Sequence, residues 1–309
     1  MTTDPGYFDL QVNGYGGVDF NLDDLSAEDL HLACEALARD GVKAILATII
    51  TEDLERMCRR LSRLARLREA DATAARIIAG IHIEGPFINP ADGYRGAHPR
   101  DAVRPADEDS AGRLLDAAGG LARIVTLAPE CDDGLRVTRM LARRNVVVSA
   151  GHCDASADRL RAGIDAGLRM FTHLGNGCPM TLHRHDNIIQ RVLGLSGQLW
   201  MSFIADGVHV PFFALSNYMR LAGLERCVVV SDAIAPAGKG PGRYRLGRWE
   251  LLIGEDLAAR APDGSHLVGS AMTMRQAEAN LTAHAGLSRE QARQLTSINP
   301  ERLLQESGR

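Results

Sequence analysis

The stretch Gly80-Ile81-His82-Ile83-Glu84-Gly85-Pro86-Phe87 decides the fold. Its isoleucines continue an apolar run that stops at the carboxylate of Glu84. The dipeptide Gly85-Pro86 is typical of a turn and ends a regular element. The pattern therefore predicts a buried strand over residues 77–84 that places Glu84 at its carboxyl end.

Three later apolar runs end in the same way, at a side chain that can bind a metal or carry a proton. The runs 146–152, 168–173 and 227–232 end at His152, His173 and Asp232. In a parallel barrel the carboxyl ends of the strands lie at one face, where catalytic groups are found. We therefore expect these three side chains and Glu84 to form one metal site.

Apolar segments of strand length alternate with helical segments or loops along most of the chain. Eight strands are predicted, over residues 6–13, 42–48, 77–84, 123–130, 146–152, 168–173, 198–206 and 227–232. This order predicts a (β/α)8 barrel, the TIM barrel, as one catalytic domain over residues 1–309. After the last strand we expect a hairpin within residues 238–261 and two helices, about 272–285 and 288–305.

The composition excludes several classes of protein. The chain of 309 residues is 45% hydrophobic and 24% charged, which is typical of a globular protein. Its net charge of −4 and scattered basic residues argue against a nucleic-acid partner. No run of about 18 apolar residues predicts a membrane span, and the first residues do not resemble a signal peptide. Six widely spaced cysteines without a Cys-x-x-Cys pair indicate reduced thiols, so we expect a cytoplasmic protein.

The polar residues at the predicted strand ends are of the kinds that zinc chemistry uses. Zinc takes imidazole and carboxylate ligands, and a catalytic site has three of them and an open position for water. Glu84, His152 and His173 satisfy this requirement. Zinc lowers the pKa of bound water to about 7, and Asp232 could take the proton of that water. A single strand-end His or Asp is more often structural, but four at equivalent places favour a metal site.

Short motifs along almost the whole chain match one known family in number, order and spacing. They are Asp9-Leu10-Gln11-Val12-Asn13-Gly14, His82-Ile83-Glu84-Gly85-Pro86-Phe87, Gly96-Ala97-His98, Leu127-Ala128-Pro129-Glu130, Ala150-Gly151-His152, Thr172-His173-Leu174-Gly175-Asn176, Ala205-Asp206-Gly207-Val208-His209, Ser231-Asp232-Ala233, Gly269-Ser270-Ala271-Met272-Thr273-Met274 and Asn299-Pro300-Glu301-Arg302. On these motifs the chain resembles the N-acetylglucosamine-6-phosphate deacetylases of the amidohydrolase superfamily, which are metal-dependent barrels.

The resemblance implies roles for individual residues. Glu84, His152 and His173 match the metal ligands, and Asp232 matches the catalytic aspartate. His98 matches a histidine near the substrate carbonyl, where it would help to stabilise an oxyanion. The substrate-binding positions are Ala97, Asn176, Gly177, Arg184 and His209. Residues expected behind the ligands, or as further contacts, are Gln11, Asn13, Glu130 and Ser270.

The resemblance also implies a cofactor and an assembly. Gln11 and Asn13 stand where two-metal members carry a His-x-His pair. An amide is a poor substitute for imidazole, so we expect one metal ion per subunit, Zn²⁺ first and another divalent metal as the alternative. In the family the equivalents of Arg184 and His209 come from the neighbouring subunit, which implies a homodimer with shared sites.

The implied reaction removes the acetyl group of N-acetylglucosamine 6-phosphate through a metal-activated water and yields glucosamine 6-phosphate and acetate. The planar guanidinium of Arg184 would suit the phosphate. A first alternative is the same chemistry on another N-acyl amino sugar or amino-cyclitol, in a biosynthetic route. A second alternative is a non-catalytic homologue that binds a sugar phosphate.

Two departures from the family pattern bear on these expectations. Family members carry segments before and after the barrel that form a small β-sandwich, whereas here Pro5-Gly6 begins the first motif and the chain stops soon after Asn299-Pro300. We therefore expect the sandwich to be absent or vestigial. The loop 174–187 is also unusually glycine-rich at its start, and Arg184-His185-Asp186-Asn187 replaces the usual Arg-Glu-Pro-Gly. The identity of the sugar is therefore the least determined part of the prediction.

Overall fold

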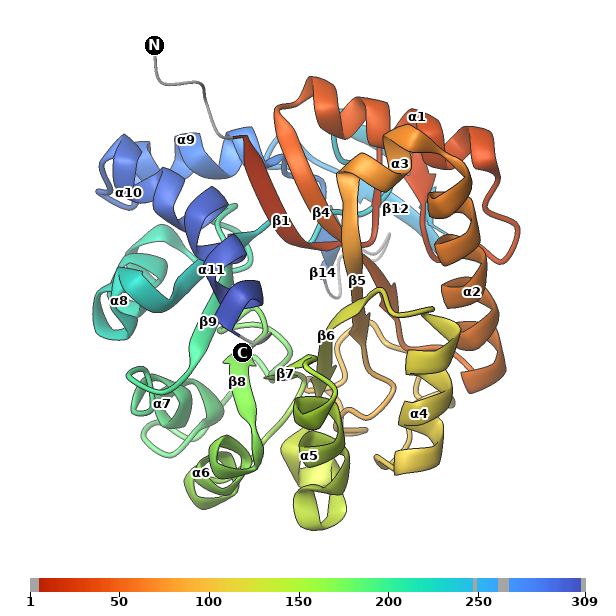
Figure 1. Cartoon of the computed structure of the whole chain (residues 1–309). Helices are drawn as coiled ribbons and strands as arrows, with labels where there is room; N and C mark the ends of the chain where they lie inside the picture. Colours follow the sequence, from red (N-terminus) through yellow and green to blue (C-terminus); the bar gives the residue numbers. More distant parts are fainter. Residues whose placement is uncertain (1–5, 247–248, 261–266, 307–309) are drawn as a thin grey trace.

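A computed structural model describes residues 6–246, 249–260 and 267–306 and confirms the barrel (Figure 1). Eight parallel strands are hydrogen-bonded in the order β1-β4-β5-β6-β7-β8-β9-β10. Their bounds are β1 Tyr7–Val12, β4 Val42–Ile50, β5 Ile78–Glu84, β6 Ala122–Leu127, β7 Val147–Ala150, β8 Leu168–Phe171, β9 Trp200–Ile204 and β10 Cys227–Val230. The strands are buried on both faces, which explains their nearly continuous apolar sequences.

The first and last strands meet just beyond their carboxyl ends. An isolated parallel bridge joins Val12 to Ala233, and the backbone N–H of Asn13 donates to the carbonyl of Ala233 at 2.7 Å. Below this bridge the buried carboxylate of Asp9 accepts the backbone N–H of Ser231 at 3.2 Å and its hydroxyl at 2.5 Å. These bonds close the barrel beside Asp232. A short hairpin, β2 Gly14–Tyr15 and β3 Val18–Asp19, follows β1 directly.

Helices surround the strands. Their bounds are α1 Ala27–Arg39, α2 Leu54–Ala70, α3 Ala72–Ile77, α4 Glu108–Ala117, α5 Arg136–Arg143, α6 Ala157–Ala166, α7 Ile188–Leu193 and α8 Phe212–Ala222, with short 3-10 turns at Pro129–Cys131, Asp133–Leu135 and Leu224–Arg226. Side-chain caps explain where several of them begin, as Ser26 accepts the N–H of Asp29 and Ser156 that of Arg159. The strand predicted over residues 77–84 begins one residue later in the structure, because Ile77 is the last residue of α3.

The expected hairpin within residues 238–261 is wrong in extent. A four-stranded antiparallel sheet follows the barrel, with β11 Gly242–Leu246, β12 Trp249–Ile253, β13 Ala258–Arg260 and β14 Leu267–Ser270. Residues 247–248 and 261–266 lie outside the described parts. A second apolar cluster, which includes Ile234, Leu251 and Ile253, stabilises this sheet. An isolated bridge from Ser270 to Ala233 attaches it to the barrel next to the end of β10.

The last segment covers the amino ends of the strands. It consists of α9 Met274–His284, α10 Arg289–Arg293, a π-helical turn Gln294–Ile298 and α11 Asn299–Glu306. The second predicted helix, over residues 288–305, is therefore two helices joined by a π-helical turn. In Figure 1 α11 crosses the end of the barrel. Asn299 donates to the carbonyl of Cys227 at 2.7 Å, and Trp200 donates to Glu306 at 3.1 Å. These contacts fasten the segment to the starts of β10 and β9.

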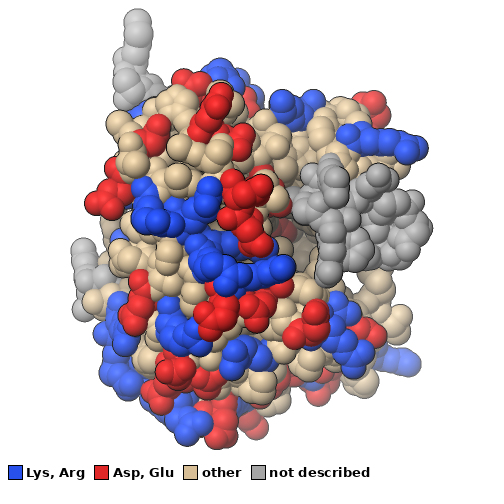
Figure 2. Space-filling view, turned by 90° about the vertical axis from the view of Figure 1, so that its right-hand side faces the viewer, with Lys and Arg blue, Asp and Glu red and all other residues tan. Residues whose placement is uncertain are grey.

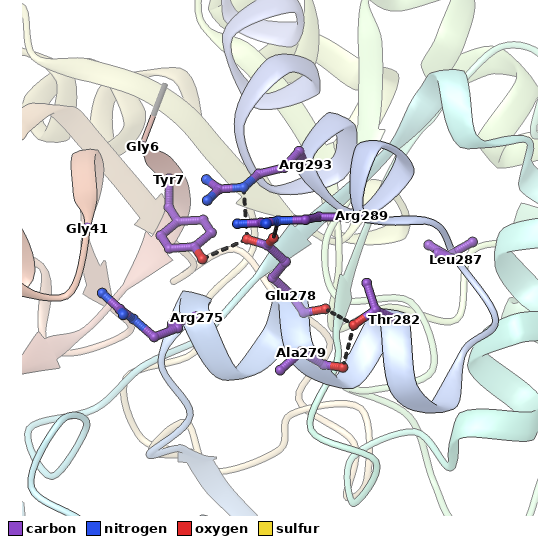
Figure 3. Close-up of a pocket in the computed structure, with 10 residues that line it drawn as sticks. All are labelled: Gly6, Tyr7, Gly41, Arg275, Glu278, Ala279, Thr282, Leu287, Arg289 and Arg293. Carbon is purple, nitrogen blue, oxygen red and sulfur yellow. Dashed lines mark hydrogen bonds and ion pairs between the residues drawn. The ribbon is translucent and has the colours of Figure 1, made fainter. Parts of the chain in front are cut away.

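A cavity of about 710 Å³ lies at this amino end, between the start of β1 and the helices α9 and α10 (Figure 3). The buried carboxylate of Glu278 accepts the hydroxyl of Tyr7 at 2.7 Å and forms ion pairs with Arg293 at 2.9 Å and Arg289 at 3.4 Å. Burial and this carboxylate raise the pKa of Tyr7 to about 12. Side chains at this end of a TIM barrel support stability, whereas the chemistry lies at the opposite end.

Glu278→Gln should therefore destabilise the fold without changing catalysis. The neutral amide loses both ion pairs in a mostly buried position, and we expect the free energy of unfolding to fall by about 1–3 kcal/mol. Urea unfolding measures this change. Glu290→Gln, at an exposed residue of α10, is the matched control and should be close to neutral. Equal stabilities of the two variants would contradict the role given to Glu278.

Charges of both signs share one face of the molecule. Figure 2 shows acidic and basic side chains interspersed on one face rather than gathered by sign. Within the described ranges, no helix has the length and apolar character that crossing a membrane requires.

Candidate active site

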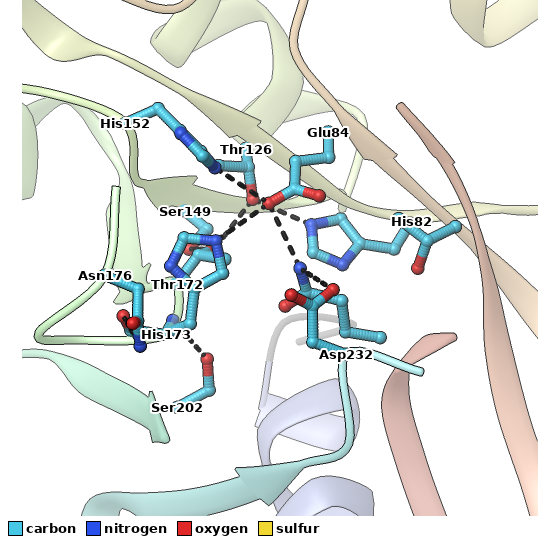
Figure 4. A network of polar contacts seen from close by, with 12 residues as sticks. His82, Glu84, Thr126, Ser149, His152, Thr172, His173, Asn176, Ser202 and Asp232 are labelled. Carbon is cyan, nitrogen blue, oxygen red and sulfur yellow. Dashed lines mark hydrogen bonds and ion pairs between the residues drawn. The ribbon is translucent and has the colours of Figure 1, made fainter. Parts of the chain in front are cut away.

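The expected metal ligands and the expected base meet at the carboxyl ends of four strands (Figure 4). Glu84 is the last residue of β5, and His152, His173 and Asp232 each stand two residues beyond the end of β7, β8 and β10. These three residues have φ angles of 52°, 36° and 49°. Such a conformation costs a non-glycine residue on the order of 1–3 kcal/mol. The same strained turn, repeated after three strands, brings each side chain to the site.

The carboxylate of Glu84 is the centre of the group. Its Oε1 atom lies 3.0 Å from Nε2 of His173 and 3.3 Å from Nε2 of His152, and it accepts a hydrogen bond from the Gln11 amide at 3.1 Å. Glu84 and the two histidines are all less than 10% exposed. Burial alone would raise the pKa of Glu84, but the close imidazoles of His152 and His173 together outweigh it and hold that pKa well below its usual range.

The geometry of His152 fits a metal ligand. Its Nδ1 atom lies 2.8 Å from the carbonyl oxygen of Tyr94, and because a carbonyl only accepts, Nδ1 carries the hydrogen. In the neutral ring Nε2 then directs a lone pair toward the carboxylate oxygen of Glu84. Metal-bound histidines are oriented in this way by their second nitrogen. A separation near 3 Å suits two ligands of one tetrahedral metal, whose ligand atoms lie about 3.4 Å apart.

Other buried polar atoms around this point also lack partners. His98 returns to the site from the loop between β5 and α4, and its ring centre lies 4.4 Å from that of His152. One ligand atom each of Glu84, His98 and His152 lies within 4.8 Å of the others, so His98 joins His173 as a candidate third ligand. Within the described part of the chain, no hydrogen bond satisfies Oε1 of Gln11, Oδ1 of Asn13, Nδ1 of His98 or Nδ1 of His173. Buried polar groups are normally paired, so this set fits a divalent cation and a polar ligand.

Asp232 faces the same centre. Its Oδ1 atom accepts the Asn13 amide at 2.8 Å and the Gln11 amide at 3.1 Å. Burial and the nearby carboxylate of Glu84 raise the pKa of Asp232 to about 6. Ser270 contributes from behind, as its backbone N–H donates to the carbonyl of Asp232 at 3.1 Å. Gln11 and Asn13 thus present their N–H groups to the carboxylates, which leaves their amide oxygens free of hydrogen bonds within the described residues.

Sequence comparison identifies the family. No family model matches the chain. The N-acetylglucosamine-6-phosphate deacetylase of Homo sapiens is 32% identical over 310 residues, which cover 97% of this chain and 74% of that protein. This chain belongs to the N-acetylglucosamine-6-phosphate deacetylase family.

Two further relatives extend the comparison. The N-acetylgalactosamine-6-phosphate deacetylase of Escherichia coli O157:H7 is 32% identical over 300 residues, which cover 97% of this chain and 77% of that protein. The N-acetyl-D-glucosamine-6-phosphate deacetylase of Mycobacterium smegmatis has been solved as a mutant in complex with N-acetyl-D-glucosamine-6-phosphate. It superposes with a TM-score of 0.86 at 33% identity, over 97% of this chain and 77% of that chain.

In this chain, three of the predicted substrate-binding positions lie beside the metal-ligand group. Asn176 donates to the carbonyl of His173 at 3.3 Å. Gly177 has a φ of 59°, and a Cβ atom there would lie 3.0 Å from Nδ1 of His152, so a larger residue would press on the ligand. Ala97 is exposed next to His98.

The two predicted phosphate ligands have different surroundings. His209 follows β9, and its Nδ1 atom lies 2.6 Å from the carboxylate of Asp206, which orients the ring. Burial opposes ionisation of Asp206, but the interaction with His209 and the backbone N–H groups of Val208 and His209 together outweigh it and lower the pKa of Asp206. Arg184 is exposed in the loop between β8 and α7, and no side chain of the described residues pairs with it. The structure therefore does not bring Arg184 into the group around Glu84.

Glu130 contacts the segments on either side of the turn that carries His152. Its exposed carboxylate accepts the side-chain amide of Asn89 at 2.9 Å and the backbone N–H of Asp154 at 2.5 Å. The backbone N–H of Asn89 in turn donates to the carbonyl of His152 at 3.0 Å. Glu130 thus braces the turn that carries His152, which corresponds to the first of the two positions expected for it, behind the ligands.

Sequence reasoning missed three groups at the site: the carbonyl of Tyr94, the carboxylate of Asp9 and the imidazole of His82. The first is a backbone atom and leaves no signal in the sequence. His82 could have been found, because it stands two residues before Glu84 on a strand, and alternate side chains share a face.

Proposed function

We propose that this chain is a metal-dependent deacetylase of a 6-phosphorylated N-acetylhexosamine, with N-acetylglucosamine 6-phosphate as the first candidate. The observation that carries the proposal is the approach of two imidazole nitrogens to the carboxylate oxygen of Glu84, with one lone pair directed at it. The relatives named above are deacetylases of such sugars, and one of them was solved with N-acetyl-D-glucosamine-6-phosphate bound.

Glu84, His152 and His173 would hold one divalent metal ion. Imidazole and carboxylate ligands suit Zn²⁺, which we take as the first candidate. When bound, such an ion supplies a nucleophilic water at neutral pH and polarises the amide carbonyl.

The chain's own residues then move protons and stabilise charge. Asp232, oriented by Gln11 and Asn13, accepts a proton from the attacking water and delivers it to the departing sugar amine. Burial and the neighbouring His152 lower the pKa of His98 to about 3, so its ring is neutral. A neutral imidazole N–H in this position would donate to the oxygen of the tetrahedral intermediate. Acetate and the free amino sugar are the products.

The phosphate would be bound by Arg184 and His209, and we propose that both are donated to the active site of the neighbouring subunit in a homodimer. The free guanidinium of Arg184 supports this assignment, because a planar fork of donors matches phosphate oxygens. A cytoplasmic location stays a prediction from the cysteines.

The direct test is acetate release from N-acetylglucosamine 6-phosphate, from its galacto epimer and from the unphosphorylated sugars, with metal content measured on the same sample. The galacto epimer is the second candidate because the relative from Escherichia coli is named for it. We expect turnover of a phosphorylated sugar and about one zinc per chain. Turnover of none of the four sugars by metal-loaded protein would overturn the proposal.

Arg184→Ala tests the phosphate contact. Loss of charge-assisted hydrogen bonds, at about 1.5–3 kcal/mol, should raise KM for the phosphorylated sugar about 10- to 100-fold with little change in kcat. Steady-state kinetics measures both constants. Arg66→Ala, at an exposed arginine of α2, is the matched control and should leave KM unchanged. The same KM in both variants would remove Arg184 from the site.

A further inference from the structure

Four polar side chains form a hydrogen-bonded chain under the metal-ligand group (Figure 4). Nε2 of His82 lies 2.7 Å from Oγ1 of Thr126, which lies 2.7 Å from Oγ1 of Thr172, which lies 2.7 Å from Oγ of Ser149. All four residues are at most 1% exposed. We call these residues the buried hydroxyl chain. The reaction proposed above uses none of them.

The direction of every hydrogen bond in the buried hydroxyl chain follows from its first member. Nδ1 of His82 lies 3.1 Å from the carbonyl of Leu10, which only accepts, so the neutral ring accepts at Nε2. Thr126 must then donate its single hydroxyl hydrogen to His82 and accept from Thr172. Thr172 in turn accepts from Ser149. Each of the three hydroxyls donates one hydrogen bond. Thr126 and Thr172 also accept one, and Ser149 ends the series, so a single arrangement of hydrogens satisfies all four side chains.

This chain cannot deliver protons to the active site. At one end His82 donates to the carbonyl of Leu10. At the other end, the only further contact of Ser149 among the described residues is the carbonyl oxygen of Ala150 at 3.4 Å, which competes with Thr172 for the single hydroxyl hydrogen. Neither carbonyl can supply or release a proton. The chain is therefore a set of fixed links rather than a relay.

The links join the strands that carry the metal ligands. His82 is on β5 with Glu84, Ser149 is on β7 three residues before His152, and Thr172 directly precedes His173. Thr126, on β6, connects them.

The strained ligand turns rest on the same groups. A Cβ atom on Gly151 would lie 2.8 Å from Cγ2 of Thr126 and 3.1 Å from Cβ of Thr172, so the two threonines pack tightly below His152. On the far side of Thr172, the hydroxyl of Ser202 accepts the N–H of His173 at 2.8 Å.

We propose that His82, Thr126, Thr172 and Ser149 are positioning residues that set the spacing of Glu84, His152 and His173 and thereby the affinity for the metal. This inference rests on the proposed metal site. Groups behind metal ligands typically change metal affinity or activity about 10- to 100-fold when they are removed. The buried hydroxyl chain differs from an ordinary core contact because it links three ligand-bearing strands through side chains alone.

The test compares Thr126→Val and Thr172→Val with Thr126→Ser, Thr172→Ser and Thr296→Val. Valine keeps the shape of threonine and removes the hydroxyl, whereas serine keeps the hydroxyl. Thr296 is an equally buried control on the π-helical turn, where its hydroxyl donates to the carbonyl of Ala292 at 2.9 Å. Measurements are the Kd for Zn²⁺ by chelator competition, the visible absorption of the Co²⁺-loaded protein and the Tm of metal-free protein.

We expect the two chain valines to weaken Zn²⁺ binding about 10- to 100-fold and to change the Co²⁺ spectrum. The serine variants should keep a Kd and a Co²⁺ spectrum close to those of the unmodified protein. Thr296→Val should lower the Tm and leave both the Kd and the spectrum unchanged. If the unmodified protein binds no metal, the proposed site itself fails. If the unmodified protein binds metal and both Thr126→Val and Thr172→Val match Thr296→Val in the Kd for Zn²⁺ and in the Co²⁺ spectrum, the positioning role fails. Should a valine variant not fold, Ser149→Ala at the end of the chain provides the same comparison.

Discussion

Replacing Asp232 with asparagine is expected to lower kcat for the phosphorylated sugar by about 10²- to 10⁴-fold, the usual contribution of a general acid–base group. Asparagine retains an oxygen that can accept the hydrogen bonds of Gln11 and Asn13, so the local structure should persist. It cannot, however, take a proton from the attacking water. Steady-state kinetics with metal-loaded protein measures the loss, and the metal content should stay close to that of the unmodified enzyme.

The pH profile separates this role from a structural one. Asp232 must be ionised to act as a base, and because burial and Glu84 raise its pKa to about 6, kcat/KM should rise with pH through an acid limb near that value. A bound cation favours the carboxylate form and moves the limb to lower pH. In Asp232→Asn the acid limb of the kcat/KM profile should be absent. Asp132→Asn, at a buried carboxylate that accepts the backbone N–H groups of Val137 and Thr138 in α5, is the control and should keep both kcat and the limb.

A second large effect is expected from Glu84→Gln. The amide removes the negative charge at the centre of the ligand group and can turn N–H donors toward His152 and His173. We expect Zn²⁺ binding to weaken by more than the 10- to 100-fold typical of groups behind the ligands, and turnover to fall with it. Metal content after dialysis and the Kd for Zn²⁺ measure this directly. The rise in Tm that saturating Zn²⁺ gives the unmodified protein should also disappear, because that rise depends on binding to the folded state.

Two comparison variants make the Glu84 result specific. Glu278→Gln changes a mostly buried carboxylate at the opposite end of the barrel and should lower stability while the Kd for Zn²⁺ is retained. His98→Asn tests the alternative ligand set, and we expect it to retain metal and lose turnover. Unchanged zinc content in Glu84→Gln would refute the proposed ligand. Loss of metal in His98→Asn would assign His98 as a ligand in place of an oxyanion donor.

The barrel and the positions of its chemistry were predictable from local pattern. A strand buried on both faces must be apolar, so the polar residue that ends each run stands out, as Glu84, His173 and Asp232 do. Parallel strands place their carboxyl ends at one face, and this single rule joins residues far apart in the sequence into one site. The same local reasoning failed for residues 238–261, where short strands of mixed composition carry no regular alternation and a hairpin was expected instead of a four-stranded sheet.

What the sequence by itself determined is the set of groups: a carboxylate, two imidazoles and an acid at the ends of barrel strands. Only the tertiary structure decided how they are held. The positive φ angles of His152, His173 and Asp232, the carbonyl of Tyr94 behind His152 and the return of His98 from its long loop depend on contacts between distant segments. The buried hydroxyl chain is the clearest case, since serine and threonine within apolar strands carry no pattern of their own. Their partners are defined by strand register across the barrel, because a hydroxyl binds whichever acceptor the neighbouring strand places within about 3 Å.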